Sequence, residues 1–288
     1  MTLDDITAEL LDQLQTGSFH DKIQAIQVLG TLKSRTIQPS LLKVLAQNDA
    51  MAEYAIKSLA YLGDSRSFFP LMNIFKATED PTTRQRILQY FYWTQDPRAT
   101  EALEEYTAKP ENPFVEIAAT ALEQCKDNPN FAYTFLGSDE HYEAARQNGR
   151  ILVTNGELTT YEPLFEENNR GFEVQRPQTY VITTAGYKMY VGGILNEHVQ
   201  VAQGEDVVAA GEVELEKCGE TWEVKYINNR STGYYPAASS FVWVKHFFEK
   251  QSDVRFVKTQ FDEVFPTRGF NDPDLLSLFP FGENYKKP

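Results

Sequence analysis

A repeat of about 31 residues in the first half of the chain limits the fold more than any other feature of the sequence. Residues 26–45 (IQVLGTLKSRTIQPSLLKVL) align with residues 56–75 (IKSLAYLGDSRSFFPLMNIF), and residues 88–106 (LQYFYWTQDPRATEALEEY) align more loosely. In each copy, apolar residues recur at helical spacing on both sides of a short turn. The aligned positions include Leu29 with Leu59, Ser34-Arg35 with Ser65-Arg66, Pro39 with Pro70, and Asp64/Arg66 with Asp96/Arg98. A repeat of two helices at this period predicts a helical solenoid.

The helical periodicity extends from the start of the chain to about residue 126, which predicts helices near 3–15, 19–32, 37–46, 50–62, 67–77, 82–94, 98–108 and 113–126. This region resembles the HEAT-repeat family, in which helix pairs are joined by short turns that contain Asp and Arg. The resemblance implies a curved surface suited to binding another protein. The aromatic run Tyr90–Trp93 covers every face of its helix, so part of it must meet the next domain or a partner.

Charge and cysteine usage exclude several functional classes. The chain has 41 acidic and 27 basic side chains, a formal net charge of -14, so binding to nucleic acid or an anionic membrane is not expected. The two cysteines match no metal spacing and no disulfide framework. The N-terminus lacks the basic-then-apolar pattern of a signal peptide, and no apolar run is long enough to cross a bilayer. These features predict a cytoplasmic location.

A turn cluster, DNPN (127–130), separates the repeat from the rest of the chain and gives two predicted domains, 1–128 and 129–288. Residues 131–148 have the pattern of one more helical stretch. Residues 149–177 are interpreted as a long loop or irregular hairpin, with strand pieces near 151–154 and 172–175. Loops of this length often have a function, so this one could also act as a lid.

The second domain has the alternating pattern of an antiparallel β meander. Short apolar runs at 180–183, 188–191 and 222–227 are separated by turn-forming residues. An amphipathic helix follows Pro236, with Phe241, Val244 and Phe248 on the face expected to meet the sheet, and residues 254–258 form a final strand. The Phe- and Pro-rich tail is expected to pack on its own domain or the repeat, or to dock on a partner. The predicted fold class is therefore α+β, an all-α HEAT-like solenoid followed by a mixed domain around a mostly antiparallel sheet.

Several short blocks of the second domain resemble the C-terminal region of the plant IQ-motif-containing calmodulin-binding proteins and related uncharacterised bacterial and fungal proteins. The matching blocks are Met189–Gly192, His198 with Gly204 six residues later, Ala209–Gly211, and Ser231, Tyr234 and Pro236. Gly233 stands where that family has histidine, which would imply an inactive or altered member if the histidine were catalytic. Calmodulin binding is not expected, because no basic residues follow Ile23-Gln24 and a net charge of -14 does not suit an acidic partner such as calmodulin.

The same blocks supply the candidate site residues. The catalytic candidates are His198, Glu212, Ser231 and Tyr234, and Asn229 is the cofactor-binding candidate. A histidine, a carboxylate, a hydroxyl and an aromatic ring form a set that could hold a dinucleotide. The alternative is structural: Gly204, Gly211 and Gly233 supply positive-φ turns, Asn228-Asn229 caps a strand, and Pro236 starts the helix.

Two functions follow from these patterns. The first is a bacterial-type interaction or adaptor protein, whose solenoid binds a protein partner and needs no cofactor or metal. The alternative is an enzyme or nucleotide-binding protein, ADP-ribosyltransferase-like and NAD-dependent, with its pocket in the second domain. A toxin-neutralising immunity protein would fit the acidic charge, but no particular residue supports it.

Overall fold

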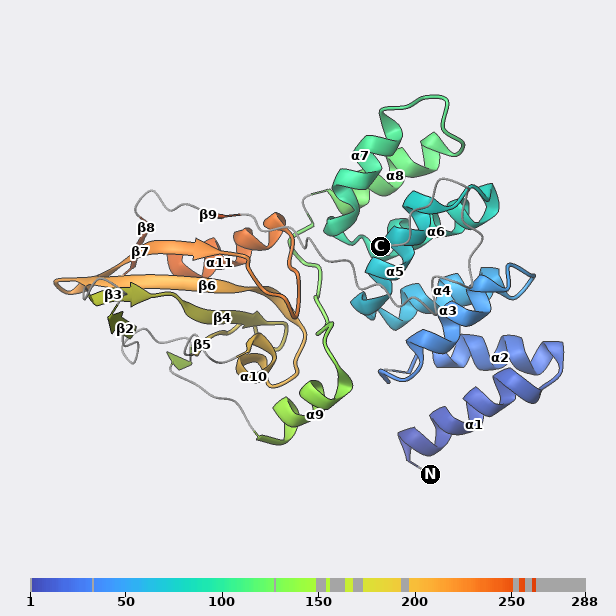
Figure 1. Ribbon diagram of the computed structural model, residues 1–288, viewed down its shortest axis with the longest axis horizontal. Helices are drawn as coiled ribbons and strands as arrows, with labels where there is room; N and C mark the ends of the chain where they lie inside the picture. Colours follow the sequence, from blue (N-terminus) through green and yellow to red (C-terminus); the bar gives the residue numbers. More distant parts are fainter. Residues whose placement is uncertain are drawn as a thin grey trace. The chain divides into compact units, whose positions relative to one another are not determined.

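A computed structural model of the protein describes residues 2–32, 34–126, 128–148, 154–155, 164–167, 173–192, 197–250, 254–256 and 261–262. The chain divides after Lys126 into two compact units, the first helical and the second built around a sheet (Figure 1). The predicted strand pieces at 151–153 and 257–258 and the C-terminal tail after Asp262 lie outside the described residues; the first two residues of the predicted tail form strand β9 (Phe261–Asp262).

The first unit contains the eight predicted helices, each ending within three residues of its predicted bounds. They are α1 (Leu3–Thr16), α2 (Phe19–Leu29), α3 (Gln38–Ala46), α4 (Ala52–Leu62), α5 (Phe68–Ala77), α6 (Pro81–Thr94), α7 (Thr100–Thr107) and α8 (Val115–Cys125), with short 3-10 turns η1 (Ser65–Ser67) and η2 (Pro97–Ala99). Capping boxes at Thr2 and Ser18 fix the starts of α1 and α2, because each hydroxyl accepts a backbone N–H that the helix leaves unpaired.

The helices pack in the pattern of a solenoid. Within each pair, α1 lies on α2, α3 on α4, α5 on α6 and α7 on α8 (Figure 1). The second helices also pack on one another in order, α2 on α4, α4 on α6 and α6 on α8, and we call these four helices the second-helix layer. Gly30 allows the end of α2 to lie close to α4, because a Cβ there would lie 2.7 Å from the Cβ of Ser58. The repeat seen in the sequence is therefore a repeat of packing.

The Asp/Arg turns of the repeat have the same structure in both copies. Asp64 caps η1 and accepts the backbone N–H of Arg66 at 3.0 Å, while the Arg66 guanidinium returns to the same carboxylate. Asp96 and Arg98 repeat this arrangement at η2, with Nη2 2.6 Å from Oδ2. Arg66 also donates to the carbonyl oxygen of Arg35, 31 residues earlier, so the turn ties one repeat to the previous one.

The second unit contains a mixed, mostly antiparallel sheet, as predicted. Its strands are β1 (Thr154–Asn155), β4 (Gln178–Thr183), β5 (Met189–Gly192), β6 (Val207–Cys218), β7 (Thr221–Asn228), β8 (Val254–Phe256) and β9 (Phe261–Asp262). The order is β1-β5-β4-β6-β7-β8, with antiparallel neighbours except that β8 and β9 both pair with β7 in parallel. A separate hairpin joins β2 (Leu164–Glu167) to β3 (Glu173–Arg176), within the segment interpreted as a long loop or irregular hairpin.

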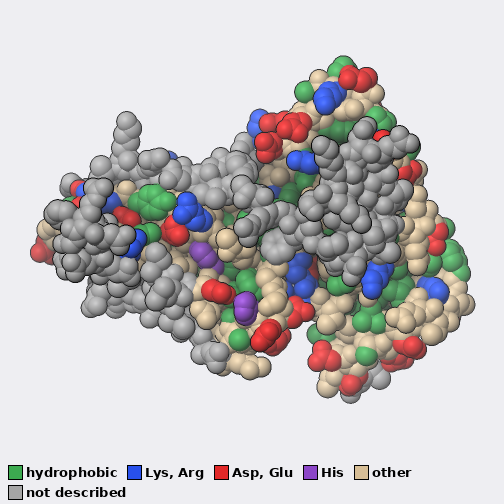
Figure 2. Space-filling model, in the orientation of Figure 1, with side chains coloured by type: hydrophobic (Ala, Val, Ile, Leu, Met, Phe, Trp, Pro, Cys, Tyr) green, Lys and Arg blue, Asp and Glu red, His purple; other side chains and the backbone are tan. Residues whose placement is uncertain are grey.

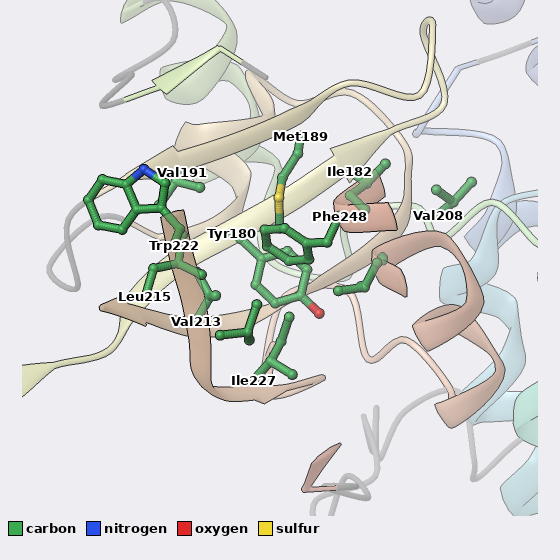
Figure 3. Close-up of a cluster of buried hydrophobic side chains, with 13 residues drawn as sticks. Tyr180, Ile182, Met189, Val191, Val208, Val213, Leu215, Trp222, Ile227 and Phe248 are labelled. Carbon is green, nitrogen blue, oxygen red and sulfur yellow. The ribbon is translucent and has the colours of Figure 1, made fainter. Parts of the chain in front are cut away.

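Both faces of this sheet are covered by apolar packing, which follows from the alternation of side chains along each strand. On one face, α11 (Phe241–Glu249) buries Val244 and Phe248 against Tyr180, Val213 and neighbouring residues (Figure 3). This confirms the predicted inward face of that helix. On the other face, α10 (His198–Ala202) packs through Val199, Val201 and Ala202, together with Tyr133, Val181, Ala210 and Tyr234.

Several local predictions were wrong. Residues 131–137 are not helical: Tyr133 forms an antiparallel bridge with Val207, and the helix α9 (Asp139–Asn148) starts only after Gly137. Tyr133 and Phe135 of the first half are buried against the sheet's second face, whereas the second half forms α9, of which Ala145 is buried in the same cluster. Pro236 does not start the next helix, because a 3-10 turn, η4 (Ala238–Ser240), precedes α11 at Phe241.

Two of the three predicted positive-φ glycines were also assigned the wrong role. Gly204 has φ +73, as expected, but Gly211 lies inside β6 and the left-handed residue near Gly233 is Tyr235, at φ 48. Gly211 is needed for space, because a Cβ there would lie 1.9 Å from the carbonyl oxygen of Asn228. At Gly233 a Cβ would lie 2.8 Å from the Phe135 ring.

Candidate functional site

His198 opens the short helix α10 and contacts the sheet through one ring nitrogen. Its Nε2 lies 3.0 Å from the carbonyl oxygen of Gly211, so Nε2 carries the proton of the neutral ring and donates it. Removal from water lowers the pKa of His198 to about 4, and the hydrogen bond to Gly211 only partly opposes this effect. His198 is therefore neutral at physiological pH, with Nδ1 unprotonated.

Glu212 belongs to a hydrogen-bond network centred on Asn228. The Asn228 amide nitrogen donates to Glu212 Oε2 at 2.8 Å and to the Tyr226 hydroxyl at 2.6 Å. Its amide oxygen accepts the backbone N–H groups of Glu212 and Arg230, at 2.9 and 2.8 Å. From the opposite face of the sheet, the Tyr180 hydroxyl donates to the Asn228 carbonyl oxygen at 2.9 Å. Asn228 thus pins β6, β7 and β4 at one point.

The remaining candidates lie in the segment after β7, where their hydrogen bonds are to backbone. The Asn229 amide donates to the carbonyl oxygen of Pro236 at 2.8 Å, and Ser231 Oγ accepts the N–H of Tyr234 at 3.3 Å. The Tyr234 ring is fully buried, and its hydroxyl donates to the carbonyl oxygen of Glu205 at 2.9 Å. These contacts fix the conformation of the segment after β7 and attach it to Glu205, which follows α10.

The structure therefore places His198 against β6, the strand that carries Glu212, and places Ser231 and Tyr234 in a neighbouring loop. His198 and Glu212 are connected through the backbone of Gly211: its carbonyl oxygen accepts from His198, and Glu212 is the next residue in the chain. Alternation along β6 places Glu212 on the same face as Ala210, the face that α10 covers. Asn228, Tyr180 and Tyr226 were missed as polar partners. The available signal was an Asn at the end of an alternating strand, which was interpreted only as a cap.

One cluster among the described residues has the spacing of a metal site, although the cysteine pattern predicted none. Glu216, Cys218 and Glu223 offer ligand atoms within 4.8 Å of one another at the β6–β7 hairpin. The Lys225 ammonium, however, lies 2.7 Å from Glu216 and 2.9 Å from Glu223, so a cation of the chain already neutralises both carboxylates. The surroundings raise the pKa of the Cys218 thiol, first through partial loss of hydration and then through Glu223, which disfavours the thiolate that a metal needs. The cluster is best described as a surface ion-pair group.

The second-helix layer exposes a row of aromatic side chains. Tyr61 on α4 is 76% exposed, and Tyr92 and Trp93 on α6 are 41% and 38% exposed. Tyr61 and Trp93 occupy the same position of the repeat, two residues after the buried Leu59 and Phe91. The Lys57 ammonium lies 5.8 Å from the centre of the Trp93 ring and one helical turn before Tyr61. We call Lys57, Tyr61, Tyr92 and Trp93 the aromatic row.

Charged and apolar side chains are interspersed over the helical unit, as Figure 2 shows for one face. Single apolar residues on a protein surface need no explanation, but aromatic residues at equivalent positions of neighbouring repeats form a pattern. Of the aromatic run Tyr90–Trp93, Tyr90 and Phe91 are buried in the solenoid and Tyr92 and Trp93 face outward. Part of that run therefore reaches solvent, as its distribution around the helix required.

Comparison with known proteins bears on the first unit. Residues 39–123 match the family model of HEAT repeats, which confirms the predicted resemblance for that part of the chain. No curated protein matches the chain. HEAT repeats stack into extended surfaces that generally serve as protein-interaction scaffolds. Among the described residues, no helix is both long and apolar enough to span a membrane.

Proposed function

We propose that this protein is an interaction scaffold whose second-helix layer binds a protein partner at the aromatic row. The observation that carries the proposal is the exposure of Tyr61 and Trp93 at the same position of consecutive repeats. Tyrosine and tryptophan dominate the binding energy of protein interfaces, because they bury a large area at a low cost in side-chain entropy. An exposed aromatic ring contributes little to the stability of the fold. Its presence at the same position of two repeats is therefore better explained by a binding partner.

The second unit fits the role of a rigid attached module. Its polar candidates hold strands and loops in place: His198 bonds a carbonyl, Glu212 bonds Asn228, and Tyr234 bonds Glu205 in the segment after α10. The resemblance of this unit to the C-terminal region of IQ-motif proteins stays a prediction. We propose that the module stabilises the complex or presents a second surface to it.

Variant-dependent capture tests the scaffold proposal. The full-length protein, a Tyr61→Ala/Trp93→Ala variant and a Phe19→Ala variant are immobilised, and proteins retained from a source lysate are quantified by mass spectrometry. Phe19 is a matched control, because it is an aromatic residue that is 57% exposed. It is the first residue of α2, whereas Tyr61 and Trp93 lie near the C-terminal ends of α4 and α6. We expect proteins that the unmodified and Phe19→Ala chains retain and the double variant loses. Equal retention by all three chains would end this proposal.

A nucleotide-binding enzyme is the second candidate, favoured by the position of neutral His198 against β6, the strand that carries Glu212. Its test is a thermal-shift scan of the protein with NAD, NADP, ADP-ribose and ATP, beside a His198→Ala/Glu212→Ala variant. A ligand at 100 times its Kd stabilises a protein by about 2.7 kcal/mol, which corresponds to several degrees for domains of this size. Stabilisation of the unmodified chain relative to its own unliganded Tm, absent in the variant, would support a nucleotide site. Equal Tm values with and without every nucleotide would remove the hypothesis.

A further inference from the structure

The geometry of the aromatic row indicates what kind of partner segment it fits, and this inference rests on the proposed scaffold function. Tyr61 and Trp93 stand on α4 and α6, two members of the second-helix layer that pack directly on one another. Packed helices have axes 8–10 Å apart. A segment that contacts both rings must therefore cross the helices and present apolar side chains at about that spacing.

We propose that the partner is an extended, polyproline II-type segment with apolar side chains or prolines at positions i and i+3 and a carboxylate beside them. A polyproline II helix has three residues per turn and rises about 3.1 Å per residue, so residues i and i+3 lie on the same side about 9.3 Å apart. This matches the 8–10 Å spacing that is typical of packed helices such as α4 and α6. Exposed aromatic side chains are the usual partners of such segments, whose extended backbone is already ordered before binding.

The charges around the row support this partner over an amphipathic helix. A helix is about 10–12 Å wide and needs a broad apolar groove. The row instead includes the charged Lys57, which lies 3.1 Å from the Glu53 carboxylate, and Arg86 lies 4.0 Å from the same carboxylate. The Lys57 side chain is 46% exposed although it pairs with Glu53, so its positive charge is open to a carboxylate of the partner. A thin segment carrying a carboxylate can contact both rings and this positive charge together.

The experiment is a selection of random 12-residue peptides displayed on phage against the full-length protein, with counter-selection on the Tyr61→Ala/Trp93→Ala variant. We expect enriched peptides with Pro or an aliphatic residue at i and i+3 and Asp or Glu adjacent. Synthetic versions are measured by fluorescence anisotropy. Their affinity should fall at least tenfold in the double variant and stay unchanged in Phe19→Ala. It should also fall when one residue is inserted between i and i+3, or when the acidic residue is replaced by lysine.

Two results would overturn the inference: enriched peptides with helical i, i+4, i+7 spacing, or no peptide whose binding depends on the row. Neither result decides the scaffold proposal, which stands or fails on variant-dependent capture of whole proteins. If capture is lost in the double variant while no extended peptide is selected, the row is an interface for a folded surface. If capture is unaffected while row-dependent peptides are selected, the row binds such segments but does not hold the captured proteins.

Discussion

The two units of this protein differ in the sequence separation of the residues whose hydrogen bonds stabilise each of them. In the helical unit, the Asp/Arg turns join residues two positions apart and recur with the repeat, as Asp64–Arg66 and Asp96–Arg98. In the sheet unit, Asn228 bonds Glu212 across 16 residues and Tyr180 across 48, while the Ala237 N–H donates to the Tyr133 hydroxyl across 104. A local interaction that repeats is visible in a sequence, whereas a long-range interaction that occurs once is not.

The largest expected effect is the loss of a buried ion pair in the local, repeating part. Asp96→Ala should destabilise the first unit by about 3–5 kcal/mol, because the Arg98 guanidinium would stay buried without its carboxylate. The Asp96 and Arg98 side chains are 1% and 6% exposed, and the guanidinium lies 4.5 Å from the centre of the Phe68 ring. Urea unfolding monitored by circular dichroism measures the loss.

Asp64→Ala is the matched control for that change. The Asp64–Arg66 pair has the same geometry at the previous repeat, but the Arg66 side chain is more exposed than that of Arg98. We expect a smaller destabilisation, since water can reach the Arg66 guanidinium once the carboxylate is removed. Equal losses at the two repeats would show that burial does not decide the strength of these turns.

In the sheet unit, the largest effect is expected at Gly211. Gly211→Ala should cost about 3 kcal/mol or more, because its Cβ would lie 1.9 Å from the backbone oxygen of Asn228 and the strands would have to separate. Gly219→Ala is the control: it has open space around its Cβ but φ +68, so only backbone strain of about 1–2 kcal/mol is expected. If Gly211→Ala were no more harmful than Gly219→Ala, the close approach of β6 to the end of β7 would be wrong.

These cases show how far the sequence could lead. Eight helices and the solenoid followed from periodicity, because each helix pair repeats its own apolar pattern and needs only its neighbours. The antiparallel sheet followed from alternation, but the role of Gly211 did not, since nothing local signals that Asn228 lies against it. The aromatic residues of 131–135 fit a helical pattern equally well until their bridge to Val207 is known. For the same reason, the short blocks suggest that His198 and Glu212 share a site, but no pattern along the chain fixes their proximity.

Asn228→Ala tests the centre of the long-range network. Removal of the amide leaves the N–H groups of Glu212 and Arg230 without their acceptor and the Glu212 carboxylate without its donor. We expect a loss of about 2 kcal/mol, the usual cost of unsatisfied, partly buried polar groups. Tyr180→Phe removes one hydrogen bond to the same residue from the other face and should cost about 1 kcal/mol. A larger loss for Tyr180→Phe would place the centre of the network elsewhere.

The pKa of His198 predicts a pH dependence specific to the sheet unit. Its pKa is about 4 in the folded protein and near 6.5 when unfolded, so the unfolded chain binds the proton more readily. Stability linked to His198 is complete above pH 6.5 and is lost as the pH falls toward 4, by about 2 kcal/mol at pH 5. The measurement compares the urea unfolding of the unmodified protein and His198→Gln at pH 7 and pH 5, which cancels the carboxylates common to both. Identical pH dependence would show that His198 titrates normally.

The smallest change in the free energy of unfolding is expected at the exposed aromatic row. A small change would separate a role in partner binding from a role in the fold. Tyr61→Ala should change the free energy of unfolding by less than about 0.5 kcal/mol, because most of its ring already lies in water. Phe91→Ala, on the neighbouring helix and fully buried, should cost about 3–5 kcal/mol. Urea unfolding of the two variants compares an inward and an outward aromatic of the same layer. A large loss for Tyr61→Ala would mean that the row serves the fold, whereas a negligible loss leaves partner binding as the reason for an aromatic residue at that position.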